Sequence, residues 1–153
     1  MSHHVHPVGP AGTVSLAAAQ AGIAAVVKAA GERGVGVVVV VAASSGDPIA
    51  LVRMDGVPPL AAESAQRKCR TVALTWRSTE SFAAALKDDL ATEPEFFHGM
   101  HHVGPLMTIG GGVPVVIGGS LAGAVAVSGA STEDDIALAG IAAASIVAAM
   151  GGR

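Results

Sequence analysis

Residues 37–54 read VVVVVAASSGDPIALVRM, and this stretch decides the fold. The run of valines that begins it is β-branched and apolar, which favours a strand buried on both faces. The residues SSGDP (44–48) are typical of a turn, and the chain then becomes apolar again. We therefore predict a β-hairpin with strands at residues 37–41 and 49–54, which would begin an antiparallel sheet.

Segments with helical spacing of apolar residues lie before and after this hairpin. The first begins after Ser15, a good N-cap, and ends near Arg33, where Gly34 can close the helix. The same spacing predicts three further helices, at residues 60–76, from about 79 to 90, and from about 132 onward.

A second pair of short apolar runs predicts another hairpin. Its strands are residues 113–117 and 121–128, joined by the sequence GGS (118–120). Both strand pairs are joined by hairpins rather than by crossovers, so the sheet should be mainly antiparallel with helices covering it. We therefore expect an α+β fold and no doubly wound nucleotide-binding fold. Between residues 93 and 105 prolines and glycines interrupt the periodicity, and we expect an irregular loop.

The composition is that of one apolar domain. Of the 153 residues, 51% are hydrophobic and 14% are charged, which is too apolar for a disordered chain. We expect residues 1–14, rich in Pro and Gly, to be a flexible segment and residues 15–153 to form a single domain. A small chain as apolar as this often buries surface between subunits, so we expect a homo-oligomer.

Charge and cysteine content exclude several classes of partner and compartment. The net charge is -3 and no long basic run exists, which argues against a nucleic-acid partner. The longest apolar run, residues 37–43, is far shorter than the roughly 20 residues that cross a bilayer, so we expect no membrane association. The N-terminus lacks the pattern of a secretion signal. Cys69 is the only cysteine, which excludes an internal disulfide, so we expect a cytoplasmic protein.

A histidine cluster lies just ahead of a glycine turn, GGGVP (110–114), and we expect any site between the two. His98, His101 and His102 are candidate metal ligands, and imidazole also serves as an axial ligand of haem iron. One of them would act in proton transfer if the protein is an enzyme. The simpler interpretation is that all three are solvated loop histidines.

Two further histidines lie at the N-terminus. His3 or His4 stands third from a free amine, depending on whether Met1 is removed. The amine, the intervening amides and the imidazole can surround Cu(II) or Ni(II) in a square plane. We interpret this as adventitious metal binding.

Cations in this charge-poor chain are candidate ligand-binding residues. Arg53 ends a predicted strand and Lys68 lies on the following helix, so both are expected to reach one cleft near the glycine turn and to bind carboxylates there. The alternative is a structural ion pair, with Asp55 or Glu63 as the partner of Arg53.

The glycines and sulfur-containing residues near these cations have two interpretations each. Amides of Gly111 and Gly112 would hold an oxyanion or a carboxylate, or else form a plain turn. No Lys-Ser/Thr follows, so the turn is not a phosphate-binding loop. Met54 is a possible soft ligand of haem iron or a core residue. Cys69 is expected to be a small buried thiol.

Four short motifs together resemble the GlcG/HbpS-like family, often described as haem-degrading. In chain order they are RMDG (53–56), Ala65 with Lys68 and Thr71, GGVP (111–114), and SGA (128–130) followed by Asp135. The resemblance implies a profilin-like sandwich with a five-stranded antiparallel sheet, assembly into oligomers, and haem-binding relatives. Where the family usually has Asp near the end of the first strand, this chain has Ala43.

These observations lead to two hypotheses about function. The first is a small-ligand-binding protein with haem as the ligand, in which Arg53 and Lys68 pair with propionates and a histidine from residues 98–102 binds iron. The alternative is a pathway enzyme of the isomerase or lyase type, in which one of the same histidines moves a proton on a small carboxylated or carbonyl substrate. Haem is the only cofactor expected. A purely structural oligomer is a third interpretation.

Overall fold

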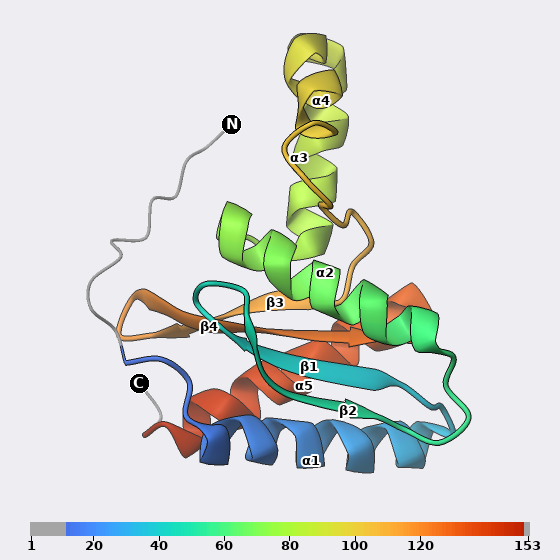
Figure 1. Cartoon of the computed structure of the whole chain (residues 1–153), viewed down its shortest axis with the longest axis vertical. Coiled ribbons are helices and arrows are strands. Elements are labelled where there is room, and N and C mark those ends of the chain that lie inside the picture. The colour runs from blue at the N-terminus through green and yellow to red at the C-terminus, as the bar shows by residue number, and fades with distance from the viewer. Residues whose placement is uncertain (1–11, 152–153) are drawn as a thin grey trace.

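The computed structural model describes residues 12–151 of the chain (Figure 1). His3 and His4 lie outside the described residues. In chain order the elements are α1 (Leu16–Arg33), β1 (Val38–Ala43), β2 (Pro48–Arg53), α2 (Pro59–Thr75), α3 (Thr79–Thr92), α4 (Pro94–Met100), β3 (Gly112–Ile117), β4 (Ser120–Ser128) and α5 (Thr132–Ala149).

The sheet is antiparallel throughout, in the order β2-β1-β4-β3. Both predicted hairpins are present, and Val39 pairs with Val52 on one side and with Val127 on the other. The α+β class is therefore confirmed. The described residues form four strands, one fewer than the family resemblance implies. Ahead of α1, Val14 gives β4 one backbone hydrogen bond, from its N–H to the Ala122 carbonyl at 3.1 Å, and no strand ladder follows.

The two faces of the sheet carry different helices. Val39 and Val41 belong to a core that α1 and α5 cover, whereas Val38 and Val40 pack beneath α2 on the opposite face. The valine run is thus buried on both faces, as its composition predicts. Close packing depends on small residues: a Cβ on Gly22 would lie 2.7 Å from the Ile146 side chain, so α1 and α5 approach each other where a glycine permits it.

The helix boundaries follow the capping residues that the sequence offers. The Ser15 hydroxyl accepts a hydrogen bond from the Ala18 N–H at 3.1 Å, and Gly34 ends α1 in the left-handed conformation. Ser131 caps α5 in the same way, accepting from the Asp134 N–H. At the end of α2, Trp76 has φ 57°, a left-handed conformation that among the described non-glycine residues occurs here alone.

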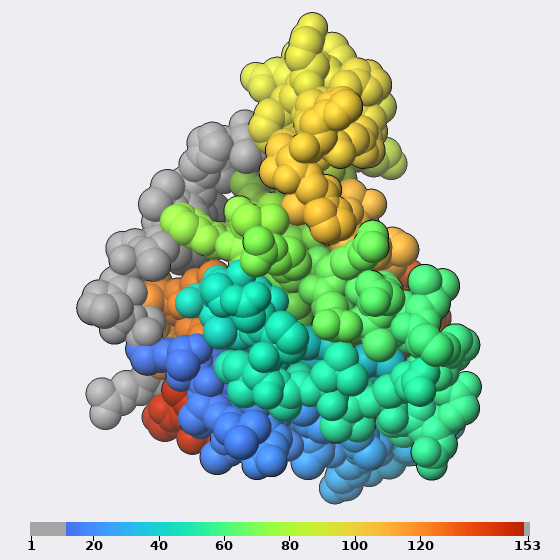
Figure 2. Space-filling view, in the orientation of Figure 1, coloured from blue at the N-terminus to red at the C-terminus, as the bar shows by residue number. Residues whose placement is uncertain are grey.

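Helices α3 and α4 leave the body as a narrow projection, which we call the arm (residues 79–100; Figures 1 and 2). The irregular loop expected over residues 93–105 is wrong for its first half, which forms α4. Pro94 occupies the first turn of α4, where a missing N–H costs nothing, so this proline begins a helix and does not break one. None of the α4 residues is buried.

None of the described helices combines the length and the hydrophobicity that a membrane crossing requires.

Candidate functional site

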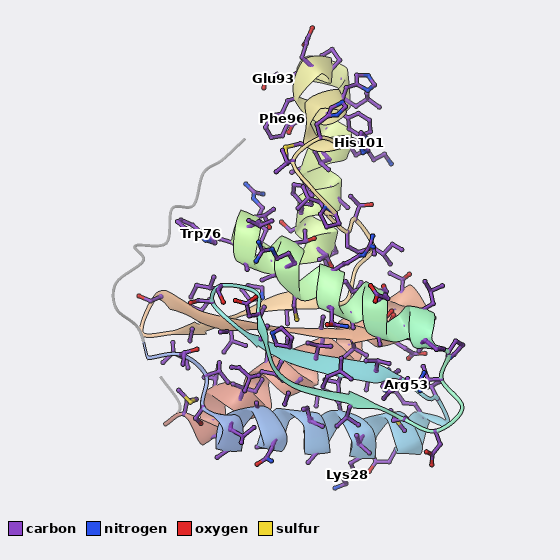
Figure 3. All side chains as sticks on the ribbon, in the orientation of Figure 1. Lys28, Arg53, Trp76, Glu93, Phe96 and His101 are labelled. Carbon is purple, nitrogen blue, oxygen red and sulfur yellow. The ribbon has the colours of Figure 1, made fainter. Side chains whose placement is uncertain are left out.

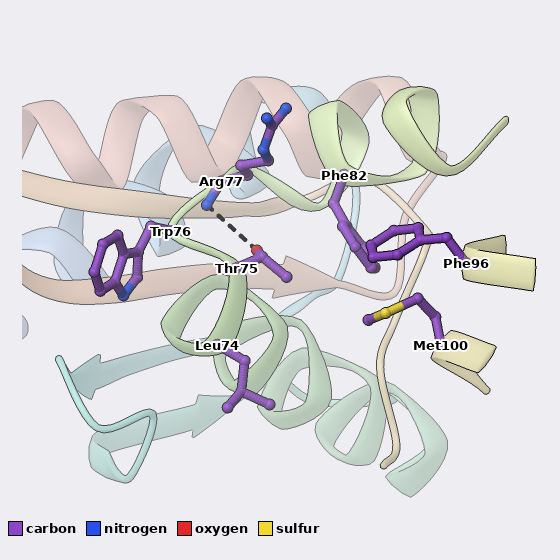
Figure 4. A pocket seen from close by; sticks show the side chains of 7 residues that line it. All are labelled: Leu74, Thr75, Trp76, Arg77, Phe82, Phe96 and Met100. Carbon is purple, nitrogen blue, oxygen red and sulfur yellow. Dashed lines mark hydrogen bonds between the residues drawn. The ribbon is translucent and has the colours of Figure 1, made fainter. Parts of the chain in front are cut away.

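A cleft of about 310 Å³ lies where the arm leaves the end of α2 (Figure 4). Most of its lining is apolar or aromatic, and it contains one cation. The lining residues are Leu74, Thr75, Trp76, Arg77, Phe82, Phe96 and Met100.

Three elements supply this lining. The turn after α2 is held by the Arg77 N–H, which donates to the Thr75 hydroxyl at 3.3 Å. Phe82 comes from the first turns of α3, and Phe96 and Met100 lie one turn apart on α4. Figure 4 shows these three side chains converging, whereas the Trp76 indole points away from them. The cleft therefore exists because α4 folds back along α3.

A smaller cavity of about 120 Å³ adjoins the arm, and His101 lines it. Met100 lines both spaces, whereas His101 lines the smaller cavity alone. The rings of His98 and His101 both contact Phe97 edge-on, with ring centroids 5.3 and 5.6 Å apart. All three candidate histidines are exposed, and His98 and His102 line neither of the two spaces.

The described residues contain no group of three His, Cys, Asp or Glu side chains that could hold a metal ion. His98, His101 and His102 therefore do not form a shared metal centre within this part of the chain. Of the three histidines, His101 is the one that lines either space, and Met100 lines the same cavity.

Lys68 is buried inside the body, and its ammonium is hydrogen-bonded to other residues of the fold. Its Nζ donates to the Val127 carbonyl at 2.8 Å and to the Asp135 carboxylate at 3.3 Å, and both side chains are at most 5% exposed. Burial lowers the pKa of Lys68 and raises the pKa of Asp135, and in each case the partner's charge opposes the shift. The sequence led us to expect a ligand-binding ammonium, and the structure instead gives Lys68 a buried partner from α5.

The glycine turn packs over this ion pair. Gly111 has φ 117°, and a Cβ there would lie 2.7 Å from the Val127 carbonyl oxygen and 2.9 Å from the Lys68 Nζ. The Gly112 N–H donates to the Thr79 hydroxyl at 3.0 Å. The amide of Gly112 is thus already hydrogen-bonded within the fold. The geometry supports a structural turn rather than an oxyanion site.

The remaining candidates lie on the body. Arg53 is exposed at the end of β2, and Figure 3 shows it far from His101, which directly follows the arm. Met54 is half-buried against the core beneath α1 and α5. Ala43 ends β1, where its N–H donates to the Asp47 carbonyl, and its methyl group supplies no carboxylate. Arg53 and the histidines therefore do not share one cleft.

Sequence reasoning missed the cleft itself. Its walls come from residues 74–77 and 96–100, which meet only because the arm folds back on itself. One signal was available: all four Phe and Trp residues of the chain lie between residues 76 and 97. Phe82 is buried, and the other three, Trp76, Phe96 and Phe97, are half-buried, so aromatic side chains are available for contacts at this end of the molecule.

Cys69 is a buried thiol, as expected, with its Sγ 3.6 Å from the Val40 carbonyl. Burial raises the pKa of this thiol from its ordinary value of 9.0 to about 12, although the Lys68 ammonium opposes the shift. We expect no appreciable reaction with Ellman's reagent in the native protein at mildly alkaline pH, and full reaction in concentrated guanidinium chloride. Fast labelling of the native protein would contradict this placement.

The raised pKa of Cys69 makes the free energy of unfolding depend on pH. Between about pH 9 and 12 the unfolded chain loses the thiol proton while the folded chain keeps it. The contribution of Cys69 to the free energy of unfolding is therefore complete below pH 9 and is lost as the pH rises toward 12. A Cys69→Ala variant should lack this part of the alkaline destabilisation in urea titrations.

Comparisons with known proteins agree with the fold. The model of a family described as "Haem degrading protein HbpS-like" matches residues 14–144. The protein GlcG of Escherichia coli K12 is 37% identical over 91 residues, which are 59% of this chain and 62% of GlcG, so the match spans less than two thirds of that relative.

Solved structures extend the likeness over nearly the whole chain. The ORFY protein of Klebsiella pneumoniae has a TM-score of 0.81 and 28% identity, covering 95% of this chain and 99% of its own. A PduOC:haem complex has a TM-score of 0.75 and 26% identity, covering 87% of this chain and 94% of its own.

Proposed function

We propose that this chain, which belongs to the HbpS-like family of haem-degrading proteins, binds haem in the cleft between α2 and the arm. The family is described as haem-degrading and the solved PduOC structure is a complex with haem, which supports small-ligand binding as the function of this chain. The observation that carries the proposal is an apolar, aromatic cleft that shares Met100 with a smaller cavity lined by His101. Self-association and a cytoplasmic location, both expected from the sequence, belong to the same proposal.

The lining matches the chemistry of haem. Phe96 offers a half-buried ring to a flat macrocycle, beside the buried Phe82. The Met100 thioether of the cleft and the His101 imidazole of the smaller cavity are groups that bind haem iron. Arg77 is the cation among the lining residues, and its guanidinium, which points away from the converging side chains in Figure 4, is suited to a propionate that extends out of the cleft. Arg77 thereby takes the role that the sequence suggested for Arg53 and Lys68.

The size of the cleft sets how haem would be held. At about 310 Å³ the cleft lies at the lower end of ligand pockets, which run from roughly 300 to 1,000 Å³. A macrocycle therefore fits with one edge exposed, or with α4 displaced outward. Since α4 buries no residue, its displacement breaks little of the core.

Haemin titration followed by absorption tests this proposal. We expect a Soret shift that saturates at one haemin per chain. The affinity of the protein for haemin should fall at least roughly tenfold in His101→Ala or Met100→Leu, since an iron ligand is lost. His98→Ala and His102→Ala are the matched controls and should bind like the parent. All variants are made with His3, His4 and His6 replaced by alanine, which removes terminal imidazoles as competing ligands.

Two outcomes oppose the proposal. No Soret shift at all would remove haem as the ligand. Retention of the parent's affinity in both the His101→Ala and Met100→Leu variants would place haem somewhere other than this cleft.

A proton-transfer enzyme is the second candidate, and the placement of His101 favours it. The imidazole lines the smaller cavity beside Thr108, where a small carboxylated or carbonyl substrate would meet a general base. This candidate predicts substrate turnover that His101→Ala abolishes while His102→Ala retains it.

A further inference from the structure

We infer that the arm is a self-association element that docks on the outer face of α2 in a second copy of this chain. The inference rests on the self-association proposed above and names the two surfaces that form it.

The arm carries the anchors that interfaces use. All three phenylalanines of the chain lie between residues 79 and 100, although aromatic residues make up only 3% of the sequence. Phe96 and Phe97 lie on α4, which buries none of its residues, so both rings remain partly exposed. Leu90 and Val103 flank them and are 44% and 62% exposed. Aromatic residues are concentrated in the centres of protein interfaces, so the arm has the composition of a contact surface.

The arm is also acidic. Residues 79–100 contain five carboxylates and one lysine. Asp88, Glu93 and Glu95 are exposed in the half of the arm that lies away from the body, and Figure 3 shows Glu93 at the tip. A partner surface for the arm should therefore be basic with apolar residues beside the charges.

The outer face of α2 has these properties. Residues 60, 63, 67, 70 and 74 follow helical spacing and are all exposed, so they form one stripe along the helix. Leu60 and Leu74 end the stripe, 77% and 52% exposed. Arg67 and Arg70 lie between them, and Glu63, 4.0 Å from Arg67, is the one carboxylate of the stripe.

The arm does not reach this stripe within one copy. The arm rises from the C-terminal end of α2 and points away from it (Figure 1), and no ion pair among the described residues joins the arm to Arg67 or Arg70. A second copy satisfies both surfaces at once, because each copy offers one arm and one stripe. Such an arrangement closes as a symmetric pair or as a ring. The cleft lies between arm and α2, so the second copy would also border the ligand site.

Charge reversal tests this surface. One variant carries Asp88→Lys with Glu93→Lys, and the other carries Arg67→Glu with Arg70→Glu. In sedimentation velocity at low ionic strength, each variant alone should associate at least about tenfold more weakly than the parent, because like charges then face each other. An equimolar mixture should associate again, since every reversed arm meets a reversed stripe. The matched control, Lys28→Glu with Glu32→Lys on the exposed face of α1, should associate like the parent.

Each outcome bears on a different statement. Association of the parent together with undiminished association of both variants would place the interface elsewhere and overturn the inference, while leaving self-association intact. Weakened variants whose mixture does not recover would overturn the pairing of arm with stripe. A monomeric parent would end the proposed self-association and this inference together, whereas haemin binding, measured separately, would stand. Far-UV circular dichroism of each variant establishes that it is folded.

Discussion

Replacing Asp135 by alanine is expected to lower the free energy of unfolding by about 3–5 kcal/mol, because it leaves the Lys68 ammonium buried without a counter-charge. Lys68 has no exposed surface, and within the described chain its Nζ has one other hydrogen-bond partner, the Val127 carbonyl at 2.8 Å. The substitution also removes the acceptor of the Ala130 N–H. Urea unfolding followed by far-UV circular dichroism measures the loss.

Two comparisons make this result specific. Glu63→Ala removes the partner of Arg67 in an exposed pair, and it should cost less than about 1 kcal/mol. The double variant Lys68→Met with Asp135→Leu should recover much of the loss, because apolar side chains replace both charges. A loss from Asp135→Ala no larger than that from Glu63→Ala would show that the buried pair does not hold α2 to α5.

Gly111→Ala is the second substitution with a large expected effect, a loss of about 2–4 kcal/mol. The φ of Gly111, 117°, is strained for any residue with a side chain. The added methyl group would also overlap the Val127 carbonyl oxygen and the Lys68 Nζ. Overpacking a rigid interior costs roughly 1–3 kcal/mol, and the left-handed conformation adds about 1–2 kcal/mol. Thermal and urea unfolding both report the change.

Substitutions at two other glycines distinguish backbone strain from steric overlap of the added methyl group. Gly119 has φ 77°, and no atom lies within 4 Å of the place where a Cβ would stand, so Gly119→Ala tests backbone strain alone. Gly140 lies in α5 with open space and an ordinary backbone, and Gly140→Ala should stabilise the helix by up to about 1 kcal/mol. If Gly111→Ala costs no more than Gly119→Ala, the glycine turn does not pack against the ion pair as described.

Local signals predicted the elements of this fold well. The valine run, the SSGDP turn and the cap at Ser15 each act within a few residues, and each led to the observed strand, turn or helix end. The helix α4 was not predicted from the sequence because it has only seven residues and begins with Pro94, a residue type that usually interrupts helices.

Long-range pairings could not be predicted in the same way. Lys68 and Asp135 are 67 residues apart, and nothing local in the sequence selects Asp135 over Glu63 as a partner. Lys68 and Thr71, which belong to one of the family motifs, are three residues apart and are both buried in α2. There Thr71 accepts a hydrogen bond from the Met107 N–H at 2.7 Å, and so helps fix the loop before β3. The family motifs thus mark how α2 is joined to the glycine turn, and the histidines lie outside that junction.

Because α4 buries no residue, it can open locally without unfolding of the whole domain. The amides of Val38 to Ala42 in β1 are buried between helices on both faces of the sheet and exchange with solvent only when the whole domain unfolds, whereas those of α4 need only a local opening. The cleft can therefore open while the sheet stays intact. A substitution on α4 is accordingly expected to change the hydrogen-exchange protection of the arm, and the affinity for the proposed ligand, while leaving the melting temperature of the domain nearly constant.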